Sequence, residues 1–575
     1  MILDALSLPP GATLEADLCI VGGGAAGLTL ASALEDSGLS VLLLEAGGRK
    51  FDPRQQDGLQ GSVAPGSSHS PPHMYRRRVL GGATAIWGGR CVPFDPIDLE
   101  ARDWVEKSGW PIGWDDLAAY YPAAQVHCEA GAYAYDVGTA LPQGAPATIE
   151  GFSDPDLVSD RLERFSRPTD FGKSTFDRLT AAPQVRILLN AQALRLVTEG
   201  AAGEAGPVQR LEAASAPGRG LTIRARRYVL ATGGLEVPRL LMASDESRRG
   251  GLGNEGGALG RYYMCHAENT LGRLRLTPSN RPVALDFEVT EDGTYVRRKF
   301  GLSAAAQRRE GLLNTIFRLH YPLIADPAHG SGVLSAMYLV KDAILPEYRR
   351  KLATIEIANR GRMVRDSRFW LSHITNVVKD SPGVLKFGQA WLRKRTFASR
   401  KLPFVVVRSR DGSYPLDVNA EQVPNFDSRV TLTGERDAYG LPRLQVDWRL
   451  HRKDIDSLVR SMHVARDAFA RSGTATLEFD DATLEDEVRA STPVGGHHIG
   501  TARMAESPRD GVVDAHCAVH GVPNLYVASA AVFPTSSHAN PTLTIVALAL
   551  SLADHLKACA ARDAAPSPKA VPELT

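Results

Sequence analysis

The stretch DLCIVGGGAAGLTLASALEDSGLSVLLLE, residues 17–45, decides the fold of this protein. Its apolar start, residues 17–21, predicts a buried strand, and a glycine-rich turn follows. Residues 28–37 favour a helix that ends at Gly38, a residue typical of helix C-termini. A second apolar strand then ends at Glu45. This order of strand, turn, helix and strand is that of a parallel, doubly wound α/β sheet.

The turn carries the glycine pattern GxGxxG at Gly22, Gly24 and Gly27. Between a strand and a helix, such glycines let backbone amides approach a pyrophosphate that lies on the positive end of the helix. Glu45 follows at roughly the 20-residue spacing of an acid that binds a ribose hydroxyl. We therefore expect a dinucleotide site here, with a tight packing turn that binds no ligand as the alternative.

The composition is that of an ordinary soluble protein with more than one domain. The chain has 575 residues, of which 66 are basic and 65 acidic, and its net charge of +1 gives no support to nucleic-acid binding. The six cysteines show no CxxC spacing, which argues against a zinc ribbon or a disulfide framework and suits a reducing, cytoplasmic compartment. The N-terminal residues show no export signal.

Two segments raise the question of a membrane. The apolar run TLTIVALALSLA, residues 542–553, is shorter than the roughly 20 residues that span a bilayer, so we expect a buried helix and no transmembrane segment. The basic, helix-like region 345–401 could bind a membrane surface or an acidic substrate, with a solvated helical face as the alternative.

The loop RRRVLGGATAIWGG, residues 76–89, places four glycines and few charges behind an arginine run. Such a loop can lie flat against a planar ring system, or it can be a packing loop without a ligand. We interpret its arginines as a solvated patch. His516, Cys517 and His520 lack a fourth ligand and follow a strand-turn pattern, so we expect no metal site there.

Three stretches place polar groups where a substrate could approach. GGHHIGTARM, residues 495–504, and SSHANPTLT, residues 536–544, set imidazole and amide groups among small residues, although a structural role is the alternative for each histidine taken alone. The third stretch is LGRYYMCHAEN, residues 259–269. It contains Tyr262, Tyr263 and His266, which could line a pocket or belong to the core.

Taken together, these stretches resemble the glucose-methanol-choline (GMC) oxidoreductase family of flavoproteins across nearly the whole chain. The segments that carry the resemblance stand in the family's order: VGGGAAGLTLASALEDSGLSVLLLEAGG, RVLGGATAIWGG, ATGGLEVPRLLMAS, HHIGTARM, NLYVASAAVFPT and ANPTLTIVALAL. Within the family, AEQVPNFDSRVTL and HHIGTARM look most like the branch of bacterial sugar dehydrogenases and pyranose oxidases.

The resemblance implies an α/β fold, α+β overall. A Rossmann-like FAD-binding domain would form from residues 1–261, with a surface excursion over 51–75, and from residues 489–562. An inserted substrate-binding domain, built on an antiparallel sheet with helices, would occupy residues 262–488. Residues 563–575 are expected to form a disordered tail.

The resemblance also implies FAD, with its pyrophosphate on the glycine turn, its adenosine ribose on Glu45 and its isoalloxazine beside the glycine loop. Ile86 stands where relatives with tethered flavin carry a histidine, so we expect noncovalent FAD. Ser529 stands where an aspartate is common, which removes the usual carboxylate contact. The residues expected at the cofactor are Gly22, Gly24, Ala26, Gly27, Glu45, Gly81, Gly82, Thr84, Trp87, Gly88, Gly89, Ala193, Ala231, Gly233, Ser529, Ala530, Asn540 and Thr542.

For catalysis, the family pattern HxxGT with Thr501 selects His497, and the partner position falls on Asn540. The implied reaction oxidises an alcohol CH–OH group of a sugar, glycoside, cyclitol or related polyol to the carbonyl, by hydride transfer to flavin N5. His497 would act as the base, since the ordinary histidine pKa is about 6.5. Asn540 would donate a hydrogen bond to the substrate oxygen, and His498 would have a supporting role.

Two alternatives stay open at this point. One is a flavin-containing lyase of the same fold, similar to hydroxynitrile lyases, in which no net redox chemistry occurs. The other concerns the electron acceptor, which can be oxygen or another molecule. Nothing in residues 262–480 identifies the sugar or its reacting hydroxyl, and the sequence does not indicate the oligomeric state.

Overall fold

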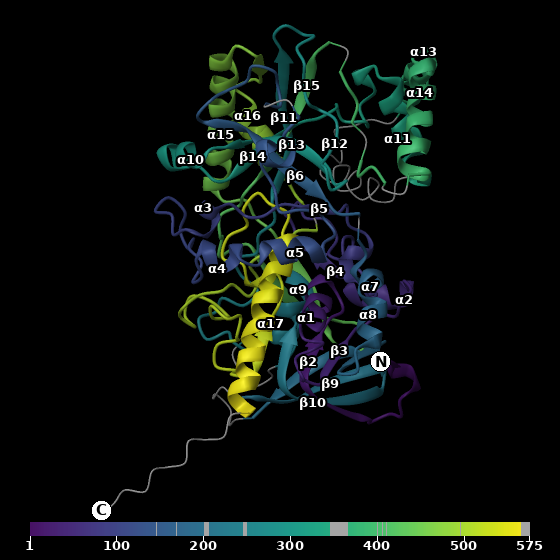
Figure 1. Ribbon diagram of the computed structural model, residues 1–575, viewed down its shortest axis with the longest axis vertical. Coiled ribbons are helices and arrows are strands. Elements are labelled where there is room, and N and C mark those ends of the chain that lie inside the picture. Colours follow the sequence, from purple (N-terminus) through teal and green to yellow (C-terminus); the bar gives the residue numbers. More distant parts are fainter. Residues whose placement is uncertain are drawn as a thin grey trace, which may run out of the picture.

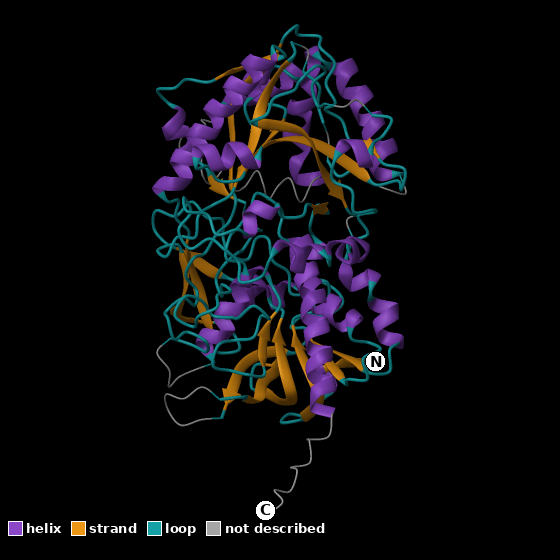
Figure 2. Cartoon of the chain, turned by 60° about the vertical axis from the view of Figure 1, so that its left-hand side comes forward, coloured by secondary structure: helices purple, strands orange, loops and turns teal. Residues whose placement is uncertain are grey.

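The computed structural model describes the chain apart from residues 145–146, 168, 200–205, 245–249, 345–365, 399–400, 405, 410, 495 and 565–575. Most of the expected C-terminal tail therefore lies outside the described residues. Two large sheets lie toward opposite ends of the long axis, with loop-rich segments between them (Figures 1 and 2). All six cysteines are free and buried.

The first sheet has eight strands in the order β1-β7-β3-β2-β10-β9-β8, with β20 beside β10. Its pairings are parallel except those of β9, which is antiparallel to both β10 and β8. The glycine turn joins β2 to helix α1, as the sequence predicts. The strands are β1 (Ile2–Asp4), β2 (Thr13–Val21), β3 (Val41–Leu44), β7 (Val185–Leu189), β8 (Gln192–Thr198), β9 (Val208–Ala216), β10 (Arg219–Leu230) and β20 (Leu525–Val527).

The second sheet has nine strands in the order β18-β11-β15-β14-β13-β6-β5, with β12 beside β13 and β19 beside β11. All of its pairings are antiparallel. Together the two sheets confirm the expected combination of a doubly wound sheet with an antiparallel one. The strands are β5 (Arg90–Cys91), β6 (Leu157–Phe165), β11 (Ala267–Leu276), β12 (Glu288–Val289), β13 (Tyr295–Leu302), β14 (Thr315–Leu319), β15 (Ser413–Ala420), β18 (Ala475–Glu478) and β19 (Thr492–Pro493).

Strands β5, β6 and β19 fall in residues that we expected to belong to the FAD-binding domain. The sequence of β6, LVSDRLERF, carries several charges and does not look like a buried strand. Asp160 and Arg161 are exposed, whereas Glu163 and Arg164 are buried and have charged partners. Glu163 accepts from Arg318 at 2.6 Å, and Arg164 donates to Asp292 at 2.7 Å.

A third, three-stranded sheet pairs β4 (Gly61–Val63) with β17 (Pro442–Asp447), which in turn pairs with β16 (Arg429–Arg436). Strand β4 belongs to the expected surface excursion 51–75, which is thus tied to the body of the protein. A Cβ atom on Gly61 would lie 2.4 Å from the carbonyl oxygen of Leu444, so only glycine fits this close pairing.

Helix α17 (Thr542–Ala564) continues well beyond the apolar run that the sequence shows. Its 23 residues are long and apolar enough to cross a membrane, yet 56% of its apolar window is buried inside the protein. Leu543, Val546 and Ala547 lie in the same core cluster as residues of α1 (Ala25–Ala33). The expectation of a buried core helix therefore fits the packing.

The remaining helices cover the sheets and connect them. Helix α15 (Arg452–Ser472) packs on the apolar face of the second sheet. The others are α2 (Pro53–Gln56), α3 (Pro96–Leu99), α4 (Trp114–Ala118), α5 (Tyr121–His127), α6 (Val137–Ala140), α7 (Phe171–Ser174), α8 (Phe176–Ala181), α9 (Gly233–Ala243), α10 (Ala304–Glu310), α11 (Gly332–Ile344), α13 (Ser367–Lys379), α14 (Ser381–Trp391) and α16 (Leu484–Arg489).

The glycine turn yields a stability prediction. A Cβ atom on Gly27 would lie 2.0 Å from the carbonyl oxygen of Gly22, whereas a Cβ atom on Gly220 of β10 would meet nothing within 4 Å. We expect Gly27→Ala to lower the free energy of unfolding of the cofactor-free protein by about 1–3 kcal/mol, the usual cost of overpacking. Gly220→Ala should change it by about 0.5 kcal/mol at most. Thermal unfolding of both variants checks this, and equal melting temperatures would contradict the packing role.

Candidate active site

The glycine turn leaves the start of α1 free for a ligand. Gly22 has a positive φ of 109°, a conformation that favours glycine. Gly24 is the N-cap residue of α1 and supplies no side-chain hydrogen bond to the helix amides. A Cβ atom on Gly24 would meet nothing within 4 Å, so the space beside its Cα is open. Uncapped amides at a helix N-terminus form an anion-binding position.

Glu45 closes β3 beside this turn and is only 6% exposed. One of its carboxylate oxygens accepts from the Gly23 amide at 2.9 Å, and the other accepts from the Gly47 amide at 2.8 Å. Burial raises the pKa of Glu45 to about 7, although both amides counteract this. Each oxygen keeps a second lone pair, so the carboxylate can also accept from a ligand hydroxyl.

A single cavity runs from the glycine turn to the C-terminal motifs, and thirteen of the residues expected at the cofactor line it. These are Gly22, Gly24, Ala26, Glu45, Gly82, Thr84, Trp87, Ala193, Ala231, Gly233, Ser529, Ala530 and Thr542. Gly27, Gly81, Gly88, Gly89 and Asn540 are not among its lining residues.

The glycines outside the cavity lining include two that hold the surrounding elements together. A Cβ atom on Gly27 would meet the turn itself, and one on Gly81 would lie 2.3 Å from Asp170 Oδ1. Hydrogen bonds hold the adjoining loop in place. The Thr84 hydroxyl accepts from the Phe171 amide at 3.1 Å. The indole of Trp87 donates to the Thr169 carbonyl at 2.9 Å.

The arginine run at the start of this loop is not the solvated patch that we expected, because Arg78 is buried and Arg76 and Arg77 are partly buried. The Arg76 guanidinium donates to Glu236 at 2.7 Å, and Arg78 lies 3.7 Å from the same carboxylate. Burial alone would raise the pKa of Glu236, but Arg239, Arg76 and Arg78 together lower it to about 2. This cluster could not be predicted from the sequence because Glu236 and Arg239 lie far along the chain from Arg76.

His497 and Asn540, which are 43 residues apart in the chain, meet directly. The amide Nδ2 of Asn540 lies 2.9 Å from His497 Nε2. On the other side of the ring, His497 Nδ1 lies 2.7 Å from His266 Nδ1. His266 Nε2 in turn lies 3.0 Å from the backbone carbonyl oxygen of Ser536. These four residues form one continuous chain of hydrogen bonds.

The direction of each hydrogen bond in this chain follows from its carbonyl end. The Ser536 carbonyl only accepts, so His266 Nε2 carries a hydrogen. A neutral His266 then accepts at Nδ1, and His497 must donate from its own Nδ1. His497 Nε2 is therefore left with a lone pair, which accepts from the Asn540 amide.

Burial keeps both imidazoles neutral. It lowers the pKa of His266 to about 4. The pKa of His497 lies well below its usual range because of burial first, and then because of His266 and the positive charge of Arg90. His266 was only one of three undecided pocket candidates in the sequence, since no local pattern indicates that it contacts His497.

The second sheet has a layer of buried charged side chains on the face opposite to its apolar core. Because side chains alternate along a strand, Arg318 lies on the face opposite to Phe317 of the core. Arg318 donates to Glu163 at 2.6 Å and to Asp417 at 3.1 Å. Its positive charge, like that of Arg90, lowers the pKa of His497, so this charged layer acts on the pair of His497 and Asn540.

His498 has different surroundings from its neighbour. Its ring is buried and stacks on Tyr263 at a centroid distance of 6.3 Å. A Cβ atom on Gly234 would lie 2.0 Å from the His498 carbonyl oxygen. The hydroxyl of Thr501 donates to the Gly234 carbonyl at 2.5 Å. This segment is thus packed tightly against the start of α9.

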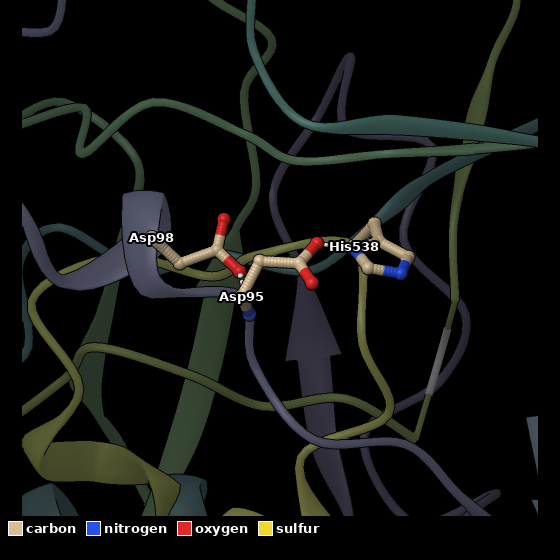
Figure 3. Close-up of side chains that lie close together, drawn as sticks. All are labelled: Asp95, Asp98 and His538. Carbon is tan, nitrogen blue, oxygen red and sulfur yellow. Dashed lines mark hydrogen bonds and ion pairs between the residues drawn. The ribbon is translucent and has the colours of Figure 1, made fainter. Parts of the chain in front are cut away.

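One cluster of possible metal ligands is found among the described residues, and it consists of Asp95, Asp98 and His538 (Figure 3). Asn314 donates to both carboxylates, at 3.0 and 2.9 Å. His538 Nδ1 lies 3.9 Å from Asp95 Oδ2, and on the other side of the ring His538 Nε2 lies 2.5 Å from the ammonium of Lys299. His516 and His520 make separate contacts elsewhere, with His555 and with the Ala505 carbonyl.

Comparison with known proteins gives two family matches. Residues 424–549 match the family model for GMC oxidoreductases, and residues 20–59 match that for an NAD(P)-binding Rossmann-like domain. The second match covers the glycine turn and Glu45, and the first covers His497 and Asn540.

Relatives align over nearly the whole chain. Paromamine 6'-oxidase from Streptomyces fradiae is 23% identical over 93% of this chain and 90% of its own length. Fructose dehydrogenase large subunit from Gluconobacter japonicus is 22% identical over 94% of this chain and 98% of its own. C-glycoside 3-oxidase from Arthrobacter globiformis is 33% identical over a shorter region, 23% of this chain and 24% of its own.

Solved structures share the fold. Pyridoxine 4-oxidase from Mesorbium loti aligns with a TM-score of 0.53 at 19% identity, over 94% of this chain and 98% of its own. A formate oxidase aligns with a TM-score of 0.51 at 17% identity, over 96% of this chain and all of its own. The fold, the family matches and the relatives agree, and together they support an FAD-dependent oxidoreductase similar to the GMC oxidoreductases, which acts on CH–OH groups.

Proposed function

We propose that this enzyme oxidises an alcohol group of a sugar, glycoside, cyclitol or related polyol to the carbonyl, with His497 as the base. The observation that carries the proposal is the hydrogen-bond chain from Ser536 through His266 to His497 and Asn540. It presents an unprotonated imidazole nitrogen next to an amide donor, which is the arrangement that alcohol deprotonation needs.

The cavity fits noncovalent FAD. The open turn at Gly24 and the uncapped start of α1 suit a pyrophosphate, and the Glu45 carboxylate suits a ribose. Ile86 in the glycine loop has no side-chain atom that could form a covalent bond to the flavin. FAD, when bound, supplies the acceptor for the hydride that leaves the carbinol carbon.

The protein residues handle the proton and the geometry. In this proposal the substrate hydroxyl takes the place of Asn540 as the donor to His497 Nε2, and Asn540 Nδ2 donates to the substrate oxygen instead. His497 takes the hydroxyl proton as the carbinol carbon gives up its hydride. The Nδ1–H bond to His266 stays in place throughout, so the ring does not rotate while its charge changes.

Two observations support a polyol as the class of substrate. Relatives that align over nearly the whole chain include an oxidase named for paromamine and a dehydrogenase named for fructose. In this chain, Arg318, Glu163 and Asp417 form a buried layer of paired charges, and the charge of Arg318 acts on His497. Such polar surroundings suit a substrate with several hydroxyls better than an apolar wall would.

The base and its partner are tested by two variants. His497→Ala and Asn540→Ala should both retain bound FAD, because neither residue is needed to form the glycine turn. In each variant, anaerobic flavin reduction should be slower by roughly 100-fold or more, the usual contribution of general acid–base catalysis. Stopped-flow absorbance measures the rate, with sugars and polyols as the substrate panel.

His516→Ala is the matched control for the loss of an imidazole. His516 is exposed, and its ring stacks on His555, outside the hydrogen-bond chain of His497. Normal reduction in both active-site variants would refute the assignment. Bleaching of the wild-type flavin under anaerobic conditions would also exclude a lyase, in which the flavin stays oxidised. Repeating the panel with oxygen and with an artificial dye identifies the electron acceptor.

His266 is tested by a pair of substitutions. A glutamine at this position can still donate to Ser536 and accept from His497, whereas a leucine can do neither. We expect His266→Leu to slow flavin reduction by roughly 10-fold or more, a part of the acid–base contribution, and His266→Gln to restore much of the rate. Equal rates in the two variants would show that His266 acts only by filling space.

The pH dependence follows from the low pKa of His497. A base is active when unprotonated, and burial moves its protonation to more acid pH. The rate of flavin reduction should therefore stay on its plateau as the pH falls through about 6.5, the ordinary histidine value, and decline only below it. Stopped-flow reduction across a pH series checks this, and a decline centred at or above the ordinary value would contradict it.

A further inference from the structure

A helical projection on the second domain has no role in the proposed chemistry. Helices α11, α13 and α14 stand together at an outer corner of the molecule (Figure 1). Phe369 and His373 of α13 are buried against Tyr338 of α11, and His373 stacks on that ring at 4.7 Å. One face of α13 is therefore fixed to the protein, and this contact orients its other face outward.

The outward face is apolar. Trp370, Leu371, Ile374 and Val378 of α13 are exposed by 42%, 63%, 51% and 68%. Residues at these spacings cover an arc of about 100° on a helix. Leu385 of α14, at 74% exposure, adds to the same projection.

The exposed apolar side chains are concentrated in one part of the chain. Of the sixteen large apolar side chains that are exposed among the described residues, nine lie within residues 339–397. Scattered apolar residues need no explanation, but such a gathering marks an interaction surface. The nine are Leu339, Val340, Trp370, Leu371, Ile374, Val378, Leu385, Leu392 and Phe397.

The charges around these residues have one dominant sign. Among the described residues 366–398 there are six basic side chains and two acidic ones, a balance of 6 − 2 = +4. The acidic ones stand at helix starts, where Asp366 accepts from the Phe369 amide and Asp380 is the N-cap residue of α14. The basic ones are Arg368, Lys379, Lys386, Arg393, Lys394 and Arg395, and all but Arg395 are exposed.

We propose that the surface of α13 and α14 docks on an anionic lipid bilayer. Apolar side chains that include a tryptophan, flanked by lysines and arginines, form the composition by which amphipathic helices enter the interface of acidic membranes. A fluid bilayer accepts such a surface without a matching shape, whereas a protein partner needs close complementarity.

The proposed contact is peripheral. The apolar helix α17 is buried in the first domain and takes no part in it. The active site lies between the two sheets, so docking through the helical projection leaves the chemistry of His497 unchanged. The inference therefore stands or falls independently of the proposed reaction.

Vesicle sedimentation tests the proposal with the full-length flavoprotein. We expect it to sediment with vesicles of phosphatidylcholine and phosphatidylserine, and much less with phosphatidylcholine alone. Added salt should weaken binding, because it screens the basic residues. The double variant Leu371→Ser/Val378→Ser and the double variant Lys386→Glu/Lys394→Glu should each bind the anionic vesicles at least 5-fold more weakly.

The control is Val289→Ser, which removes an exposed apolar side chain on β12, and it should bind as the wild type does. Unchanged flavin content and circular dichroism show that each variant is folded. Failure of the wild-type protein to bind anionic vesicles, or equal binding by all variants, overturns the proposal. A change of sedimentation coefficient in Leu371→Ser/Val378→Ser without vesicles also overturns it, in favour of contact between copies of the chain.

Discussion

The arrangement of the active site depends on one chain of hydrogen bonds, which begins at the backbone carbonyl of Ser536 and ends at Asn540. Because a carbonyl cannot donate, it fixes the proton on His266 and, through it, the proton on His497. His266 stands at the start of β11 in the second sheet, whereas the other members lie in the C-terminal motifs near the first. The tautomer of His497 thus depends on the correct docking of the two domains.

Burial also determines the protonation state of the imidazoles in this hydrogen-bond chain. Two adjacent imidazoles, with Arg90 and Arg318 nearby, disfavour a positive charge on His497 in the resting enzyme. The proposed base is therefore unprotonated when a substrate arrives.

Much of the first domain could be predicted because its determinants are local. The strand, the glycine turn and Glu45 lie within residues 17–45, and the structure places them as that pattern indicates. The pairing of His497 with Asn540 came from resemblance to a family, since their contact at 2.9 Å joins segments that no local spacing connects.

The features that sequence reasoning missed are those set by distant partners. Glu163 of strand β6 is buried because Arg318, far along the chain, neutralises it. Arg76 is largely removed from solvent because Glu236 pairs with it. His266 lies 231 positions before His497, and its role follows only from the folded contact.

The contacts of His266 and His497 fix the tautomer of the His497 ring. Nitrogen NMR of the enzyme labelled with ¹⁵N-histidine measures it directly, with His497→Ala to assign the signal. We expect a neutral ring at pH 7 that carries its proton on Nδ1 and has an unprotonated Nε2. A His497 ring that is protonated on Nε2, or on both nitrogens, would contradict this expectation.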